Sequence, residues 1–411
     1  YYAFTSGNGT SISRADADLY TINLMNNRGS NYSYTVAPNF YSKSTGNIET
    51  LSNWGTSADG SGTAPVNFTT AGVTYNIRNN ATPTIGASWT VSGTSAKIVV
   101  GDGTNACNFI VPSNYVVTSS NIEVSNAGKI TRTSSAVNPF IVSGTFNILA
   151  GGTYVHNYAN ETLPFIIWAS TANLNIDENL ADDEFTESFG NVNINGNSTV
   201  RMMTTTGNSS NTIQGNLTIN STGVVVATQT NTTNQTLTIN GNMTVSSNSG
   251  SFYIESNSTS SNVTKKILVL GSYIQTSGIL NIASNTSTLV GPNERISILE
   301  VRGDFTQTGG SITESATDSD YRCQILLSKT SGIQYIESIG NTTGLIEFNV
   351  AGSGAQCVVP ATKTFVQSGV SPTFVVANGS QSIDLNILGT FKRTSANPIT
   401  TTGTVQFGSG G

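Results

Sequence analysis

Apolar and polar residues alternate one by one along most of this chain. The runs LTINSTGVVVA at 217–227, KKILVLGSYI at 265–274 and ISILEVRGDFTQ at 296–307 show the alternation clearly. A period of two places successive side chains on opposite faces of a strand, and it is typical of half-buried β-strands. The apolar spacing of an amphipathic helix is nowhere sustained over three turns. The pattern therefore predicts an all-β protein built from many short strands.

A short phrase recurs within these strands: an apolar residue, any residue, glycine, a small polar residue, an apolar residue and a polar residue. Its clearest glycines are Gly215, Gly241, Gly271 and Gly303, and looser copies surround Gly144, Gly196 and Gly389. The spacing drifts between roughly 20 and 32 residues, which suits the coil of a β-solenoid and is shorter than a propeller blade. We expect a right-handed parallel β-helix of roughly 15 coils, stacked about 4.8 Å apart.

The composition fits such a stack. Val, Ile, Leu and Phe would fill a narrow core, while Thr and Ser face outward. Glycine and asparagine would occupy the corners, where the backbone needs positive φ or a side chain that bonds to it. Stacked Asn and Thr side chains would then satisfy the backbone groups at each bend. Only 10% of residues are charged, as expected where like charges repeated on successive coils would repel each other.

One longer phrase occurs twice and suggests how the chain is organised. Arg132, Asn138, Gly144 and Gly151–Gly152 have counterparts in Arg393, Asn397, Gly403 and Gly410–Gly411. We therefore expect an aromatic-rich cap or docking segment at 1–40, a first solenoid section at 41–127, a full module at 128–388 and the start of a further module at 389–411. On this interpretation the natural chain continues beyond residue 411.

Charge and hydropathy exclude two classes of partner. The 17 Lys and Arg residues give a net charge of −6 and form no basic stripe, so we expect no nucleic-acid binding. No run approaches the roughly 20 apolar residues that span a bilayer, so we expect no membrane insertion. The first residues, YYAFTSGNGT, lack the basic and apolar regions of a signal peptide and fit a mature N-terminus left after cleavage.

The acidic segment NIDENLADDEFTESFG is the main candidate for a bound ion. Its carboxylates are Asp177, Glu178, Asp182, Asp183, Glu184 and Glu187. They could bind calcium through clustered oxygen ligands, although their spacing is not that of an EF-hand loop. The alternative is a solvated loop or short helical turn that leaves the solenoid. No other cofactor is expected.

The remaining candidate residues have structural alternatives. Cys323 and Cys357 lie in strand-like runs and could form a disulfide between neighbouring coils, or they could be buried free thiols, as Cys107 could. His156 is the only histidine, and its place beside a glycine turn favours a structural role over catalysis. The three tryptophans could stack on sugars or pack in the core; they are Trp54, Trp89 and Trp168.

Several linked phrases carry a resemblance to a known class of protein. They are residues 41–112, beginning YSKSTGNIETLSNWG, and the run from GGTYVHNYANETLPFIIW through GDFTQTGGSITES to LLSKTSGIQYIESIG. Both resemble large secreted surface proteins of Bacteroidota, which are exported by the type IX route. The resemblance implies a β-solenoid with tandem modules, secretion to the cell surface, and attachment or fibre formation. The small sorting domain that usually ends such proteins has no counterpart here.

These observations favour a non-enzymatic extracellular rod, either a surface adhesin or a filament subunit that assembles head to tail with other copies of itself. The alternative is a carbohydrate-active β-helix, either a polysaccharide lyase or a module that binds cell-surface or environmental glycans. A lyase would need acidic and basic side chains gathered on one face, and the sequence shows no such convergence.

Overall fold

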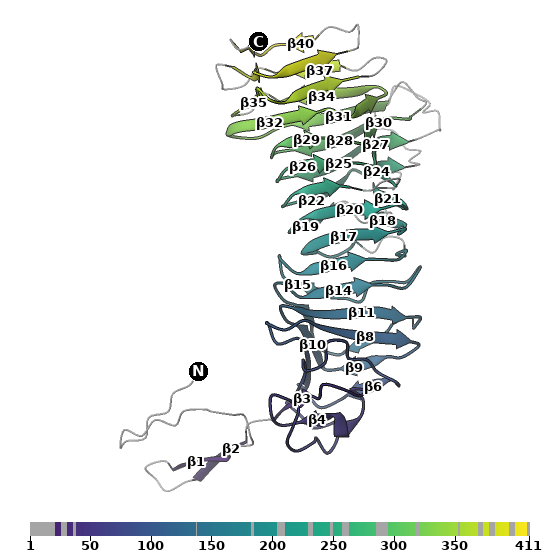
Figure 1. Ribbon diagram of the computed structural model, residues 1–411, viewed down its shortest axis with the longest axis vertical. Helices are drawn as coiled ribbons and strands as arrows, with labels where there is room; N and C mark the ends of the chain where they lie inside the picture. Colours follow the sequence, from purple (N-terminus) through teal and green to yellow (C-terminus); the bar gives the residue numbers. More distant parts are fainter. Residues whose placement is uncertain are drawn as a thin grey trace. The chain divides into compact units, whose positions relative to one another are not determined.

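A computed structural model gives the fold of most of the chain (Figure 1). It describes residues 21–25, 31–35, 38–136, 138–181, 185–203, 210–228, 233–246, 250–256, 263–284, 295–316, 321–351, 354–368, 373–377, 383–393 and 399–408. The described elements are strands, apart from one 3-10 turn, η1, at Leu51–Asn53. No helix in these ranges is long and apolar enough to cross a membrane.

The chain divides into two compact units. Unit 1 comprises Tyr1–Val155 and Pro164–Ile167, and unit 2 comprises His156–Leu163 and Trp168–Gly411. Both units are parallel β-helices, so the predicted solenoid is confirmed. The division falls near residue 155, whereas the repeated phrase suggested a boundary at 127/128. The two boundaries differ in kind, because one follows spatial contacts and the other follows repetition in the sequence.

Unit 1 coils through three sheets. Sheet 1a contains β3 (Asn39–Ser42), β4 (Trp54–Gly55), β5 (Thr74–Ile77), β7 (Lys97–Val100), β10 (Asn121–Val124) and β13 (Phe146–Ile148). Sheet 1b contains β8 (Cys107–Ser113) and β11 (Gly128–Ser134), and sheet 1c contains β6 (Trp89–Val91), β9 (Val117–Ser119) and β12 (Phe140–Val142). Two further strands, β14 (Thr153–His156) and β15 (Ile167–Trp168), contain residues of both units.

The register of unit 1 repeats regularly. Ile98 pairs with Ile122, and Ile122 pairs with Phe146, so each coil advances 24 residues. All three side chains are buried, and they form one apolar column in the core. Near the N-terminal end the core is aromatic: Trp54 and Trp89 are stacked with ring centroids 5.7 Å apart. Burial of each Ile or Phe side chain in the apolar column contributes about 1.5–3 kcal/mol to the free energy of unfolding, relative to an exposed side chain.

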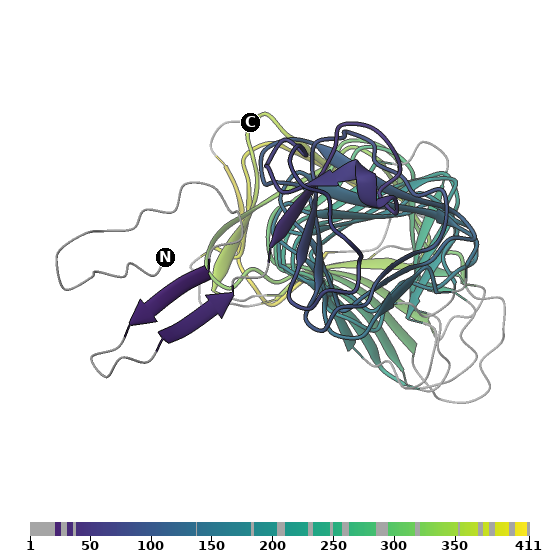
Figure 2. The same cartoon turned by 90° about the horizontal axis from the view of Figure 1, so that it is seen from below.

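Unit 2 also coils through three main sheets (Figures 1 and 2). Sheet 2a contains β16 (Asn173–Ile176), β17 (Asn191–Gly196), β20 (Leu217–Ser221), β23 (Met243–Val245), β26 (Tyr273–Gln275), β29 (Phe305–Gln307), β32 (Gly332–Ser338), β36 (Thr364–Gln367) and β39 (Thr390–Arg393). Sheet 2b contains β18 (Val200–Met203), β21 (Val224–Thr228), β24 (Ser251–Ser256), β27 (Ile279–Ser284), β30 (Ser311–Thr313) and β33 (Asn341–Thr343). Sheet 2c contains β19 (Ser210–Ile213), β22 (Gln235–Ile239), β25 (Thr264–Val269), β28 (Arg295–Val301), β31 (Tyr321–Leu327), β34 (Ile346–Val350), β37 (Thr373–Val376) and β40 (Ile399–Thr401).

The long strand β32 starts a fourth sheet. Its second half, Ile336–Ser338, pairs with β29 in sheet 2a. Its first half, Gly332–Tyr335, pairs instead with β35 (Ala355–Val359). Sheet 2d then continues through β38 (Leu385–Ile387) and β41 (Val405–Phe407). The last coils therefore have an additional side, which the sequence pattern did not predict.

The four clearest glycines of the phrase form a column beside sheet 2a, although not for the predicted reason. The amide of Gly241 donates to the Gly215 carbonyl at 2.8 Å, and the amides of Gly271 and Gly303 continue the ladder at 3.0 and 2.8 Å. A Cβ on Gly303 would lie 2.4 Å from the Gly271 oxygen. Positive φ is absent at all four glycines. Close backbone approach, rather than left-handed backbone, therefore requires glycine here.

Side chains beside this glycine column form a second ladder, as the sequence predicted. The Asn216 amide donates to Asn191 Oδ1 at 2.9 Å, and the Asn242 amide donates to Asn216 Oδ1 at 2.8 Å. The backbone amide of Ser272 likewise donates to Asn242 Oδ1 at 2.8 Å, and that of Asp304 donates to Ser272 Oγ at 3.1 Å. Each side chain thus satisfies a backbone amide one coil further along, where the turn leaves that amide without a strand partner.

The predicted N-terminal segment is described only in part. β1 (Thr21–Met25) pairs antiparallel with β2 (Asn31–Thr35). Residues 1–20, 26–30 and 36–37 lie outside the described residues. The cap or docking role of residues 1–40 therefore stays a prediction.

Candidate functional site

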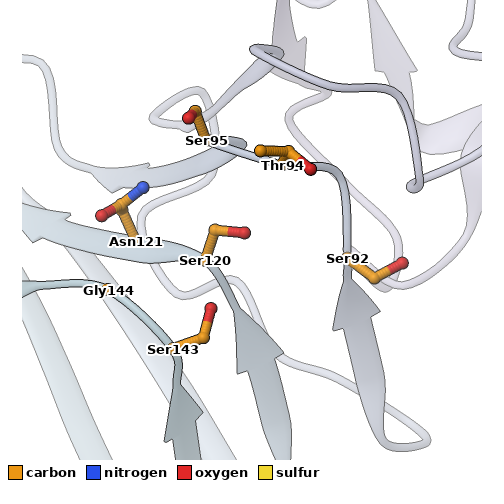
Figure 3. Close-up of a pocket in the computed structure, with 7 residues that line it drawn as sticks. All are labelled: Ser92, Thr94, Ser95, Ser120, Asn121, Ser143 and Gly144. Carbon is orange, nitrogen blue, oxygen red and sulfur yellow. The ribbon is translucent and has the colours of Figure 1, made fainter.

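A polar depression lies along one corner of unit 1 (Figure 3). It has a volume of about 420 Å³ and is open to solvent. Three successive coils line it, and the lining residues are Ser92, Thr94, Ser95, Ser120, Asn121, Ser143 and Gly144. All of these residues lie where sheet 1c ends or sheet 1a begins. The depression is therefore the corner that carries the glycine phrase in this unit.

Stacking hydrogen bonds hold the walls of this depression. The Gly144 amide donates to the Ser120 carbonyl at 2.8 Å, and Ser120 Oγ donates to the Gly93 carbonyl at 2.8 Å. Asn121 Oδ1 accepts from the Thr145 amide at 3.1 Å. The lining offers hydroxyl and amide groups and has no titratable side chain. Such a surface can hydrogen-bond a neutral polyhydroxyl ligand, but it supplies no general acid or base.

The structure separates the predicted calcium ligands that it describes. Asp177 Oδ1 accepts from Asn195 Nδ2 at 2.9 Å, and Glu187 Oε2 accepts from Trp168 Nε1 at 3.2 Å. Glu178 is exposed. Asp182, Asp183 and Glu184 lie outside the described residues. Within the described part of the chain, no three His, Cys, Asp or Glu side chains gather closely enough to hold a metal ion, and the calcium site stays a prediction.

The disulfide between Cys323 and Cys357, one of the two alternatives for these residues, is not formed. Both residues are free and buried, and so is Cys107. Cys323 lies in β31 of sheet 2c and Cys357 in β35 of sheet 2d, so the two thiols belong to different walls of the coil. Burial raises the pKa of Cys357 to about 12 and that of Cys107 to about 11. The alternative interpretation, buried thiols that pack as small apolar groups, describes all three.

His156 and the tryptophans are core residues. His156 has no exposed surface in β14. Trp54, Trp89 and Trp168 are 0%, 1% and 6% exposed, so their ring faces cannot stack on a sugar from solvent. Trp168 packs against Phe189 with centroids 5.6 Å apart. Core packing, the structural alternative for these residues, is the one that the structure shows.

A buried group of polar and charged side chains is the feature that sequence reasoning missed. It lies inside unit 2 where sheets 2b and 2c meet, and its members are Gln235, Glu255, Lys265, Arg295 and Ser297, each at most 1% exposed. Arg295 Nε lies 3.5 Å from Glu255 Oε1, and Ser297 Oγ donates to Glu255 Oε2 at 2.7 Å. Lys265 Nζ donates to Gln235 Oε1 at 2.9 Å and to the Thr233 carbonyl at 2.7 Å.

The strand alternation held a signal for this group. In β25 the buried positions are Lys265, Ile267 and Val269, so the lysine has the same parity as two core residues. In β28 the parity of Leu299 and Val301 likewise places Arg295 inside. A lysine or arginine at a core parity predicts a buried charge that needs a partner.

Comparisons with known proteins give no further guide to function. No family model, no curated protein and no solved structure matches this chain.

Proposed function

We propose that this chain is a non-enzymatic structural segment of a secreted or cell-surface protein, either an adhesin or the subunit of a surface filament. The resemblance to large secreted surface proteins of Bacteroidota supports the extracellular setting. The low charge and the Ser-, Thr- and Asn-rich outer faces suit a surface that contacts water and other molecules along its whole length.

The observation that carries the proposal is the continuity of the ladders within each unit. In unit 2 the column from Gly190 to Gly303 repeats the same backbone hydrogen bond on successive coils at 2.8–3.1 Å. The side-chain ladder beside it repeats as regularly. The glycines and asparagines at these positions hold one coil on the next. A scaffold needs residues with this role.

A test must separate a scaffold from a polysaccharide-cleaving enzyme. The purified chain is incubated with a panel of acidic and neutral polysaccharides, with and without calcium, and the release of new chain ends is measured. In parallel, beads coated with the chain are scored for attachment to cells and glycan surfaces. We expect attachment without cleavage. Catalytic turnover of any polysaccharide would overturn the proposal.

Self-assembly is the second part of the proposal. In a filament, the segment at 1–40 would dock on the opposite end of another copy, and adding strands to an exposed sheet edge is the physical route. Electron microscopy of the full chain and of a chain lacking residues 1–40 tests this. Filaments that require the segment support docking, whereas filaments that form equally well without it, or monomers in both cases, contradict it.

Glycan binding at the corner depression is a second candidate function. The observation that favours it is the neutral lining of hydroxyl and amide groups from three coils. Ser143→Tyr would fill the depression, and Ser52→Tyr is a matched control at an exposed serine outside it. If glycans bind there, glycan-array signals should fall at least tenfold in the first variant only. Equal signals in both variants would exclude this site.

A further inference from the structure

Lys265 and Gln235 bring an amine and a carboxamide together inside the core of unit 2. The two residues are paired in register on neighbouring parallel strands, β22 and β25. Both are fully buried, and Nζ lies 2.9 Å from Oε1. A second contact orients the amide, because Gln235 Nε2 donates to the Met203 carbonyl at 3.1 Å. The nucleophile and the acyl group are thus fixed next to each other by the fold.

We propose that these two side chains join in an intramolecular isopeptide bond. Lys265 Nζ attacks Gln235 Cδ, the bond from Cδ to Nε2 breaks, and Nε2 leaves as ammonia. One proton passes from Nζ to the departing nitrogen. The products are a secondary amide between the two coils and one molecule of ammonia, so the step needs no oxidant, reductant or cofactor.

The surroundings favour this reaction through the pKa of the amine. Burial lowers the pKa of Lys265 to about 8; the charge of Glu255 raises it and that of Arg295 lowers it. About a tenth of the amine is therefore neutral and nucleophilic at pH 7.

The bond would link one coil covalently to the next, closing a loop from residue 235 to residue 265. At this place Lys265, Arg295 and Glu255 stand where other coils have apolar side chains, and buried charges weaken a core. A covalent link between the two coils would strengthen the stack there. It requires only that unit 2 folds, so the proposal does not depend on the adhesin or filament function.

The intact mass of the denatured full chain is the direct test. After the folded protein has been held at about pH 9, where the amine is mostly neutral, we expect a mass lower than the sequence mass by one ammonia. Lys265→Met should restore the full mass for its sequence. Lys266→Met, a change at the outward-facing lysine on the same strand that contacts Glu300, should keep the deficit.

Proteolysis then locates the bond. Glu255 is the only acidic residue between positions 235 and 265, so a glutamate-specific protease separates the two side chains into the fragments 188–255 and 256–294. The cross-linked chain should yield these fragments still joined, and trypsin should fail to cut after Lys265. Succinimide formation at an Asn–Gly pair such as Asn240–Gly241 also releases ammonia, but it leaves the fragments separate.

A wild-type chain that is folded and keeps its full sequence mass after this incubation would overturn the proposal. So would a mass deficit that persists in Lys265→Met, because the ammonia would then come from elsewhere. The main measurement is the mass of the wild-type chain, so the test still decides the question if a variant fails to fold.

Discussion

The phrase that occurs twice produces the same three strands in both places, yet its side chains end in different environments. The first copy contains β11, β12 and β13, and the second contains β39, β40 and β41. Ile148 is fully buried in the first copy, whereas its counterpart Phe407 is 70% exposed in the second. In the first copy a residue of the next coil, Tyr154, packs on Phe140 and Phe146.

This difference separates two things that a sequence pattern specifies. The alternation of residues determines where a strand runs and which side chains point inward. Burial of those side chains comes from the coils on either side, as in other repeat proteins where each unit is stable only through its neighbours. The counterparts Asn397 and Gly410–Gly411 lie outside the described residues, so the comparison rests on the three strands.

Alanine at the last inward position of each copy should give the largest contrast. Ile148→Ala should lower the free energy of unfolding by about 2–5 kcal/mol, because it opens a cavity in a packed core. Phe407→Ala should change it by less than about 1 kcal/mol, since most of the ring is already in water. Denaturant unfolding of both variants measures the difference. Equal costs would mean that another chain or segment covers Phe407 in solution.

The glycine of the shared phrase tests whether close approach is equally strict in both copies. A Cβ on Gly144 would lie 2.6 Å from the Ser120 oxygen, and one on Gly403 would lie 2.6 Å from the Ala377 oxygen. Each alanine substitution should cost about 1–3 kcal/mol through forced shifts of backbone. The two costs should be similar, because each added Cβ would meet one backbone oxygen and one side-chain oxygen at 2.6–2.7 Å. Hydrogen exchange of the neighbouring strands measures where the loosening occurs, and a loss at one glycine only would contradict the comparison.

The arginine of the phrase should give a smaller contrast. Arg132 is fully buried and donates to the Ser134 and Ala136 carbonyls at 3.3 and 2.8 Å. Arg393 is half-buried and donates to Gln367 Oε1 at 2.8 Å. Arg132→Met should cost about 1–3 kcal/mol, since it leaves buried carbonyls without these donors. Arg393→Met should cost at most about 1 kcal/mol. Thermal unfolding compares the two, and the reverse order would show that the second arginine is the more buried one in solution.

The sequence predicted the structure well wherever a feature depends on the alternation of side chains along a single strand. It predicted the strand class, the coil spacing, the glycine column and the Asn ladder, because each depends on local alternation and on which residues fit a corner. It gave the right reason at Gly196, where φ is +61°. It gave the wrong reason for the glycine column of unit 2, since contact with the preceding coil at Gly303 cannot be seen in a single coil. It also did not predict the fork at β32, where one strand pairs with two different sheets.

The candidate site was less predictable, because its parts come from different coils. The corner depression joins Ser92, Ser120 and Ser143, which lie more than twenty residues apart from one another. The buried pair of Glu255 and Arg295 joins two sheets, and only the parity of Arg295 hinted at it. The acidic segment stood out in the sequence through composition alone, and composition does not determine whether carboxylates converge.

The smallest difference in stability should come from the side-chain oxygen that accepts a backbone hydrogen bond from each copy. Asn121 Oδ1 accepts from the Thr145 amide at 3.1 Å, and Asp384 Oδ2 accepts from the equivalent Thr404 amide at 2.8 Å. Asp384→Asn should change the free energy of unfolding by less than about 0.5 kcal/mol, because an amide oxygen does the same task in the first copy. Asp384→Ala and Asn121→Ala should each cost about 1–2 kcal/mol, since each leaves a turn amide without its acceptor. Denaturation of the three variants side by side decides the point, because a large loss in Asp384→Asn would show that the second copy needs the charge as well as the acceptor.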